Sequence, residues 1–186
     1  MRVIIDGDGV LLRYTEPLFA ALEITEYTLE DVTEWDIFGL VHRWFGADAH
    51  EEAVALNDTA SFWESQTFLE GAEESVAFIR ARCDELICVT HPWEGCATWR
   101  EIRTAHLAKL GFKPSEIFFN GDKRGYAGDL FIDDKPSHIT DWAAANPSGR
   151  AAIFDQPYNR PPAFNWPERV CWRPGHAELG RLLSPR

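Results

Sequence analysis

Positive charge is scarce in this chain of 186 residues. There are 18 lysine and arginine residues against 30 acidic ones, a formal net charge of −12, and only four of the basic residues are lysines. No stretch gathers them into a basic stripe, and proteins that hold polymeric nucleic acid depend on lysine and arginine contacts with phosphates. The sequence therefore argues against a DNA- or RNA-binding protein and favours a small ligand.

Cysteine is also sparse, and its spacing is uninformative. The four cysteines form no CxxC pair and have no histidine partner at zinc-finger spacing; they are Cys83, Cys88, Cys96 and Cys171. Neither a structural zinc site nor a disulfide framework follows from this pattern, and buried thiols are expected.

Long hydrophobic runs are missing. No stretch approaches the roughly 20 apolar residues that cross a membrane. The first strand is expected to begin at Arg2 or Val3, which leaves no room for a signal peptide. We therefore expect a soluble, cytoplasmic protein with no membrane partner.

The negative charge is concentrated in one segment. Residues 15–70 hold thirteen acidic residues and one basic residue, Arg43, whereas the remainder is balanced. This segment is rich in helix formers and aromatics and contains no convincing strand, so it predicts a helical insertion. The expected domains are a core at 1–13 and 71–186 and a helical cap at 14–70. The side chains expected to form the buried faces of the cap are Leu18, Leu22, Val41, Trp44, Phe45, Val54 and Leu56.

Outside the insertion, short apolar runs alternate with helical patterns. The runs are Val3–Ile5, Leu86–Val89, Leu130–Ile132 and Ala151–Phe154, and the helix candidates are Glu73–Arg82, Cys96–Leu110, Ser137–Ala145 and His176–Leu183. Short apolar runs of this kind are typical of parallel strands buried on both faces. The alternation predicts an α/β fold with a parallel sheet and helices on both faces.

Two carboxylates follow the first apolar run directly. Asp6 and Asp8 are two residues apart in an extended segment, so both side chains leave the same face, and the glycines that follow each of them let the backbone turn. One carboxylate could attack a bound group while the other moves a proton. An ordinary turn is the plain alternative. A calcium loop is excluded because Val10 and Pro17 stand where an EF-hand needs oxygen ligands.

Other polar residues end the neighbouring runs. Thr90 follows the second, and Asp133 and Asp134 follow the third. Ligands bind outside the carboxyl ends of parallel strands, so these residues should meet in one crevice. Clustered carboxylates repel one another, and a hard divalent cation, Mg²⁺ by preference, would neutralise them. Taken alone, each of these elements is weak evidence for a catalytic site, because a turn, a helix cap or a solvated loop explains it equally well.

In combination these elements resemble the four motifs of the haloacid dehalogenase phosphatase superfamily. The order is Ile-Ile-Asp-Gly-Asp-Gly-Val, then Val89-Thr90, then Lys123, then Leu130-Phe131-Ile132-Asp133-Asp134. The segments 121–136 and 155–159 are similar to the 5'(3')-deoxyribonucleotidase branch of that superfamily. The resemblance implies a Rossmann-like core with a small helical cap after the first strand.

The resemblance also implies a role for each motif. Asp6 would attack the phosphorus to form an aspartyl phosphate, and Asp8 would protonate the leaving oxygen and then activate water. Thr90 and Lys123 would hold the phosphoryl group. Mg²⁺ would lie between the carboxylate of Asp6, the backbone carbonyl of Asp8, the phosphate and the carboxylate of Asp134, with Asp133 reached through water.

His91 departs from the branch, which has a small hydroxyl residue at this place. Two interpretations stay open: His91 donates to the phosphate and shapes the pH profile, or it packs against the following helix.

Substrate choice is expected to come from the cap. An aromatic side chain there could stack on a nucleobase, although each could equally be part of the cap's own core. The candidates are Tyr14, Phe19, Trp35, Phe62 and Trp63 of the cap with Trp93 of the core, and the pair Phe62–Trp63 is preferred because the branch has an aromatic pair near that place.

The sequence thus predicts a Mg²⁺-dependent phosphoric monoester hydrolase of the 5'-nucleotidase type. Its substrates in nucleotide metabolism would be nucleoside monophosphates, pyrimidine deoxyribonucleotides first. One alternative is a phosphatase for a sugar phosphate or another small metabolite. A second is a non-catalytic nucleotide-binding module, against which the presence of Asp8 argues because a binder needs no proton shuttle. A homodimer stays open, since nothing in the sequence marks an interface.

Overall fold

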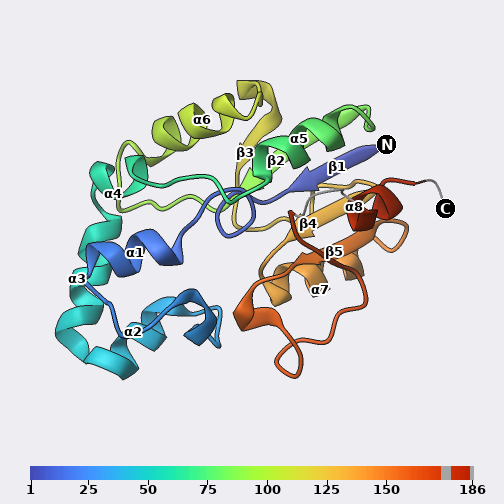
Figure 1. The fold of residues 1–186 in the computed structure, drawn as a ribbon. Helices are drawn as coiled ribbons and strands as arrows, with labels where there is room; N and C mark the ends of the chain where they lie inside the picture. The colour runs from blue at the N-terminus through green and yellow to red at the C-terminus, as the bar shows by residue number, and fades with distance from the viewer. Residues whose placement is uncertain (173–176, 185–186) are drawn as a thin grey trace.

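The computed structural model of the chain describes residues 1–172 and 177–184. Its centre is a six-stranded sheet in the order β3-β2-β1-β4-β5-β6, and every neighbouring pair is parallel (Figure 1). The strands are β1 (Arg2–Ile5), β2 (Glu85–Thr90), β3 (Ile117–Phe119), β4 (Leu130–Asp133), β5 (Arg150–Phe154) and β6 (Arg169–Val170). The predicted α/β fold is confirmed.

Alternate residues of the central strands enter two different hydrophobic cores. Val3 and Ile5 of β1 face one core, and Ile4 faces the other, where it packs with Ile87 and Phe131. Both cores are fully enclosed, because all three β1 residues are 0% exposed. A sheet covered on both faces explains why each strand reads as an unbroken apolar run.

Helices on the two faces come from the segments between the strands and from the segment after β6. They are α5 (Ala72–Arg80), α6 (Trp99–Lys109), α7 (Pro136–Ala145) and α8 (Ala177–Leu182), with 3₁₀ turns η2 (Pro114–Glu116) and η3 (Pro157–Asn159). Residues of α5, α6 and α8 contribute to the core around Val3, whereas α7 contributes Ile139 and Trp142 to the core around Ile4. The predicted first residue of the last helix, His176, lies outside the described residues.

Two strands were not predicted. β3 has three residues and β6 has two, so neither is long enough to give a periodic signal. The helix predicted from Cys96 is also shorter than expected, since α6 begins at Trp99.

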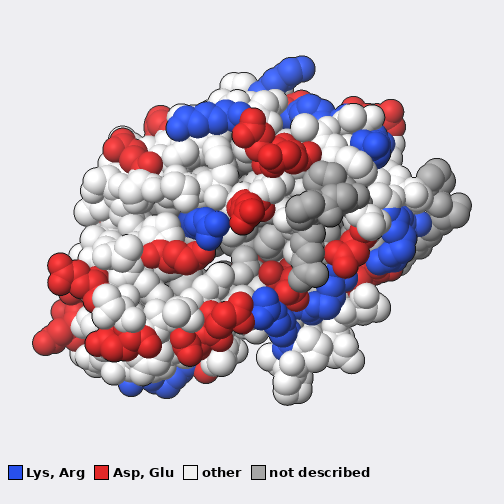
Figure 2. Space-filling view, viewed as in Figure 1, with Lys and Arg blue, Asp and Glu red and all other residues white. Residues whose placement is uncertain are grey.

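The segment after β1 forms a group of helices whose hydrophobic core is shared with Cys96 and Trp99, at the start of α6. Its elements are α1 (Thr15–Ala21), the 3₁₀ turn η1 (Leu29–Asp31), α2 (Ile37–Phe45), α3 (Ala47–Asn57) and α4 (Ala60–Glu64). These helices lie beyond the carboxyl ends of the strands, on the left in Figure 1, and acidic side chains cover much of the cap surface at the lower left of Figure 2. Leu18 and Val41 are buried as predicted, but Phe45 is 39% exposed because it lies at the last turn of α2, and this prediction was wrong.

The chain enters and leaves the cap side by side. The amide of Arg13 donates to the carbonyl of Thr67, and the amide of Leu69 donates to the carbonyl of Leu11. Two short segments therefore connect the cap to the sheet and hold it over the strand ends.

Two further expectations can be compared with the structure. Cys88 and Cys96 are buried, whereas Cys83 and Cys171 are only half-buried, so the expected burial holds for two of the four thiols. Within the described residues, every helix is too short or too polar to pass through a lipid bilayer.

Candidate active site

The loop after β1 places two carboxylates at the edge of the sheet. The amide of Asp6 donates to the carbonyl of Ile132 on β4, and the loop then closes on the carbonyl of Gly7, which accepts from Leu11 and Leu12. Asp6 is 7% exposed. The side chain of Asp8 is 25% exposed. Both side chains line the same cavity.

Lys123 is the cation behind Asp6. Its Nζ lies 2.7 Å from Asp6 Oδ1 and 2.7 Å from Asp133 Oδ2, and the side chain is almost completely buried. The amide of Gly7 also donates to Asp6 Oδ1. Because both contacts use Oδ1, the other oxygen of Asp6 is left to face a substrate. Burial raises the pKa of Asp6 to about 6, while Lys123 opposes that rise.

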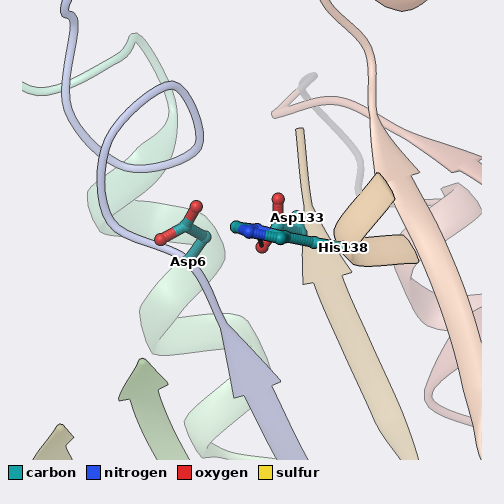
Figure 3. Close-up of side chains that lie close together, drawn as sticks. All are labelled: Asp6, Asp133 and His138. Atoms are coloured by element: carbon teal, nitrogen blue, oxygen red, sulfur yellow. Dashed lines mark hydrogen bonds and ion pairs between the residues drawn. The ribbon is translucent and has the colours of Figure 1, made fainter. Parts of the chain in front are cut away.

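Asp133 is a supporting residue of the site. Its carboxylate accepts from Lys123, from the amide of Lys135 at 2.8 Å, and pairs with His138 Nδ1 at 3.0 Å. Despite burial, these partners hold the pKa of Asp133 at about 2. Figure 3 shows Asp133 and His138 together, opposite the carboxylate of Asp6.

Thr90, at the end of β2, lies against the loop of Asp6. A Cβ atom on Gly7 would come within 3.0 Å of Thr90 Oγ1, so glycine is what permits this close approach. Thr90 lines the cavity together with Asp6 and Asp8.

Asp134 is the carboxylate without a cation. Tyr158 OH donates to Asp134 Oδ2 in a short hydrogen bond, and no ion-pair partner of Asp134 is present among the described residues. Burial raises the pKa of Asp134 well above its usual range, and the neighbouring charges of Asp133 and Asp6 raise it further. A buried acid in this situation is stable in its ionised form only when a cation joins it.

The donor atoms around Asp134 fit a hard divalent cation. The residues that would hold Mg²⁺ are Asp6, Asp134 and the backbone carbonyl of Asp8, all oxygen ligands of the kind Mg²⁺ takes. The ligand atoms of Asp6, Asp133 and His138 also lie within 4.8 Å of one another. The ammonium group of Lys123 already bridges Asp6 and Asp133, which makes that second arrangement unfavourable for a cation.

Asp8 is held by an arginine of α6 and not by Lys123. Nη2 of Arg103, on α6, donates to Asp8 Oδ1 at 2.6 Å and to Gln66 Oε1 at 2.8 Å. Burial raises the pKa of Asp8, and the guanidinium of Arg103 counteracts that effect.

The site opens into a cavity of about 370 Å³ between the sheet and the cap. Of the residues predicted for the site, the cavity lining includes Asp6, Asp8, Tyr14, Trp35, Trp63, Thr90, His91, Trp93 and Asp134. The cap is tied down over it, because Trp93 Nε1 donates to Asp58 at 2.8 Å and Lys135 Nζ lies 3.6 Å from the ring centroid of Trp35.

Four of the predicted residues do not line the cavity. Lys123 and Asp133 lie behind Asp6, where they act through it. Phe62 and Phe19 are 4% exposed and pack in the core that the cap shares with the start of α6. Both aromatics are absent from the cavity lining, and Phe62 packs edge-to-face on Tyr14 with ring centroids 5.9 Å apart.

His91 lies between the cavity and the loop of Gly121. Its ring packs against the backbone of Gly121, where a Cβ atom would come within 2.2 Å of Nδ1, and the residue also lines the cavity. Partial burial and the nearby cations Lys135 and Lys123 lower the pKa of His91. A neutral imidazole is therefore favoured at this wall of the cavity.

Sequence reasoning missed several residues of the site. Tyr158 lies in the segment 155–159, and the resemblance of this segment to the deoxyribonucleotidase branch is the signal that could have identified it. Gln156, whose Nε2 donates to the carbonyl of Gly9 at 2.7 Å, lies in the same segment. Arg103 gives no signal, because an arginine within a helix pattern is read as exposed.

Comparison with known proteins supports the fold. No protein-family model matches the sequence, and no curated protein matches it either. The structure is similar to a haloacid dehalogenase-like hydrolase from Burkholderia xenovorans LB400, with a TM-score of 0.59 and 13% identity over 100% of this chain and 98% of that chain.

Two more solved structures share this architecture. The hydrolase YfnB from Bacillus subtilis, bound to magnesium, has a TM-score of 0.53 and 14% identity over 98% of this chain and 97% of its own. Protein tyrosine kinase A from Mycobacterium tuberculosis has a TM-score of 0.61 and 16% identity over 99% of this chain and 98% of that chain. The chain therefore has the fold of the haloacid dehalogenase-like hydrolases, and because that fold also occurs in a protein described as a kinase, function must be argued from the site.

Proposed function

We propose that this chain, which has the haloacid dehalogenase fold, is a Mg²⁺-dependent phosphatase that hydrolyses nucleoside monophosphates. The observation that carries the proposal is the pair Asp6 and Asp8 at one cavity, each with its own cation, beside a third carboxylate, Asp134, that has none among the described residues. Two carboxylates that are paired with cations and a third that is not suit a site that binds a metal ion together with a phosphate. A non-catalytic module would not need Asp8 facing the cavity.

Asp6 is the proposed nucleophile. Its free oxygen attacks the phosphorus, the bond from phosphorus to the leaving oxygen breaks, and Asp8 gives that oxygen a proton. Water then attacks the phosphorus, Asp8 takes a proton from that water, and the bond to Asp6 breaks. Lys123 keeps Asp6 ionised at neutral pH, since its charge opposes the effect of burial on the pKa of Asp6.

Phosphate contacts are assigned to the residues around this pair. Thr90 would donate its hydroxyl, and Lys123 would add positive charge to the phosphoryl group as it transfers. Mg²⁺, held by Asp6, Asp134 and the carbonyl of Asp8, would neutralise phosphate charge.

The substrate proposal rests on the wall of the cavity. Trp35, Trp63 and Trp93 offer flat apolar surface on which a base can stack. Phe38 extends this surface, with its ring centroid 5.7 Å from that of Trp93. The resemblance of segments 121–136 and 155–159 to the deoxyribonucleotidase branch adds pyrimidine deoxyribonucleotides as first candidates.

Charge in the cavity lining favours an uncharged leaving group. Glu16 and Asp36 line the cavity, Arg13 already pairs with Glu16 at 2.6 Å, and the ammonium of Lys135 lies 3.6 Å from the ring centroid of Trp35. A nucleoside fits such a wall better than a second phosphate does. A sugar phosphate is the second candidate from the same chemistry, but a polar wall would suit it better than three tryptophans.

Phosphate release from a panel of substrates tests the proposal. The panel contains deoxyribonucleoside and ribonucleoside monophosphates, sugar phosphates and p-nitrophenyl phosphate, each with Mg²⁺ and with EDTA. Asp6→Asn is the inactive blank and Asp141→Asn, an exposed acid on α7, is the matched control. We expect selective release from dUMP or dTMP that Asp6→Asn abolishes and Asp141→Asn leaves unchanged.

Three other results would redirect the proposal. Activity that survives Asp6→Asn would contradict the aspartyl phosphate. Release from sugar phosphates alone would keep the chemistry and discard the nucleotide. Nucleotide binding without any release would favour the binding module.

A further inference from the structure

Arg103 is a fully buried arginine directly behind Asp8. It is 1% exposed, although it lies on α6, whose neighbouring Arg100 is in an exposed ion pair with Glu94. Its Nη2 bridges the core and the cap, because Asp8 belongs to the loop after β1 and Gln66 belongs to the end of the cap segment. One donor atom thus connects the proposed proton shuttle with the cap.

Rigid neighbours surround the guanidinium. Its Cζ lies 5.1 Å from the ring centroid of Trp99 and 5.5 Å from that of Trp63, which also lines the cavity. Within the described part of the chain, Arg103 Nε and Nη1 have no hydrogen-bond partner. Asp8 is thus the one carboxylate in the described structure that pairs with Arg103.

Packing alone does not explain this arrangement. An apolar side chain of similar size would fill the space between two tryptophans without the cost of desolvating a charge and leaving two donors unpaired. The feature that only an arginine supplies is a fixed, permanently charged donor aimed at Asp8.

The bond leaves Asp8 with one oxygen held and one free. Oδ1 accepts from Arg103, while Oδ2 has no partner among the described residues and the side chain keeps its 25% exposure toward the cavity. Proton transfer needs donor and acceptor within about 3 Å of each other. A carboxylate clamped at one oxygen presents the other in a constant position.

We propose that Arg103 is a positioning residue that holds Asp8 in the orientation for proton transfer, with Gln66 tying this orientation to the cap. The inference rests on the proposed function. Oδ2 of Asp8 gives its proton to the leaving oxygen as the bond to phosphorus breaks, and the same oxygen later takes a proton from the attacking water. Arg103 keeps all of its protons throughout.

Two substrates of nearly equal size distinguish a positioning role of Arg103 from a merely structural one. Phenyl phosphate has the poorer leaving group and needs the proton from Asp8, whereas p-nitrophenyl phosphate leaves readily without it. The variants are Arg103→Met, Arg103→Lys, Asp8→Asn and the double variant Arg103→Met with Asp8→Asn. Arg100→Met, on the same helix, is the matched control.

We expect Arg103→Met to lower kcat/KM, which reports the steps up to formation of the aspartyl phosphate, at least about tenfold more for phenyl phosphate than for p-nitrophenyl phosphate, since general acid catalysis contributes about 100-fold or more. Arg103→Lys, which keeps the charge and is the safer variant for folding, should show the same bias to a smaller degree. The double variant should lose no more than Asp8→Asn alone, because both changes remove the same step. Arg100→Met should behave like the wild type.

The outcomes are distinguishable. Equal losses of kcat/KM on both substrates in folded Arg103→Met and Arg103→Lys proteins, or no loss, would overturn the positioning role and leave the proposed function standing. Wild-type protein that releases no phosphate from either substrate, or Asp6→Asn protein that stays active, would overturn both. Thermal melting of each variant separates loss of folding from loss of positioning.

Discussion

Gly9 lies so close to Asp134 that a Cβ atom on the glycine would come within 2.6 Å of Asp134 Oδ2. The same atom would lie 3.2 Å from Tyr158 OH, and the backbone of Gly9 has a φ of +74°. The loop after β1 can therefore pass over Asp134 only because this residue has no side chain. The two halves of the proposed metal site are brought together by that close approach.

Replacing Gly9 with alanine should damage the site beyond the effect of backbone strain. We expect Gly9→Ala to lower the free energy of unfolding by about 2 kcal/mol more than Gly111→Ala does, because overpacking costs about 1 to 3 kcal/mol. Gly111 is the matched control, since its φ is +82° and nothing lies within 4 Å of its Cβ position. Urea unfolding of both variants, together with phosphate release, gives the comparison; equal losses would contradict the collision with Asp134.

Mg²⁺ should stabilise the folded protein through Asp134. Because a ligand that binds only the folded state raises stability by RT ln(1 + [L]/Kd), about 10 mM Mg²⁺ should raise the Tm of the wild type, and EDTA should reverse the rise. Asp134→Asn should lose this shift and need more Mg²⁺ for activity, whereas Asp141→Asn should keep both. A full Mg²⁺ shift in Asp134→Asn would remove Asp134 from the metal site.

Trp35 offers a cleaner test of base stacking than Trp63. Trp63 is 3% exposed and its Nε1 donates to the carbonyl of Asn57 at 2.6 Å, so its removal would also disturb the cap. Trp35 is 48% exposed and lines the cavity. Trp35→Ala should raise KM for a nucleoside monophosphate about fivefold or more, since stacking is worth about 1 to 3 kcal/mol, and leave KM for p-nitrophenyl phosphate unchanged.

Phe45→Ala is the control for that measurement. Phe45 is the other large exposed aromatic of the cap, at 39%, and it is not among the residues that line the cavity. It should leave both KM values unchanged. If Trp35→Ala and Phe45→Ala behave alike, the nucleobase does not stack on Trp35.

Acid should destabilise the fold through His106. Burial, together with the nearby charges of Arg103 and Lys109, lowers the pKa of His106 from 6.5 to about 4. Above pH 6.5 the imidazole is neutral in both the folded and unfolded states. Between pH 6.5 and 4 the unfolded chain binds a proton that the folded chain does not, so the free energy of unfolding falls, by up to about 3 kcal/mol.

A variant isolates that contribution. His106→Gln should reduce the dependence of the unfolding free energy on pH between 6.5 and 4, whereas His42→Gln, at an exposed position on α2, should retain it. Urea unfolding at pH 7, 6 and 5 provides the slopes. An unchanged slope in His106→Gln would show that His106 takes up its proton in the folded state as well.

Much of the fold could be predicted because its signals are local. The apolar runs of β1, β2, β4 and β5 are visible in the sequence since each strand is buried on both faces, and the carboxyl ends of parallel strands meet at one edge of the sheet. Chain order and this rule are enough to group Asp6, Asp8, Thr90 and Asp134. The strands β3 and β6 escaped because they are too short for periodicity.

The sequence by itself thus determined the α/β class, the helical insertion and the set of carboxylates at the strand ends, because periodicity and chain order carry that information. Only the tertiary structure decided the partner of each charge: Arg103 reaches Asp8 across 95 residues, Lys123 bridges Asp6 and Asp133, and Asp134 is left without a cation among the described residues. It also decided that Trp35 lines the cavity while Phe62 is buried in the cap. These outcomes depend on how segments far apart in the chain pack together, and such contacts leave no trace in local sequence patterns.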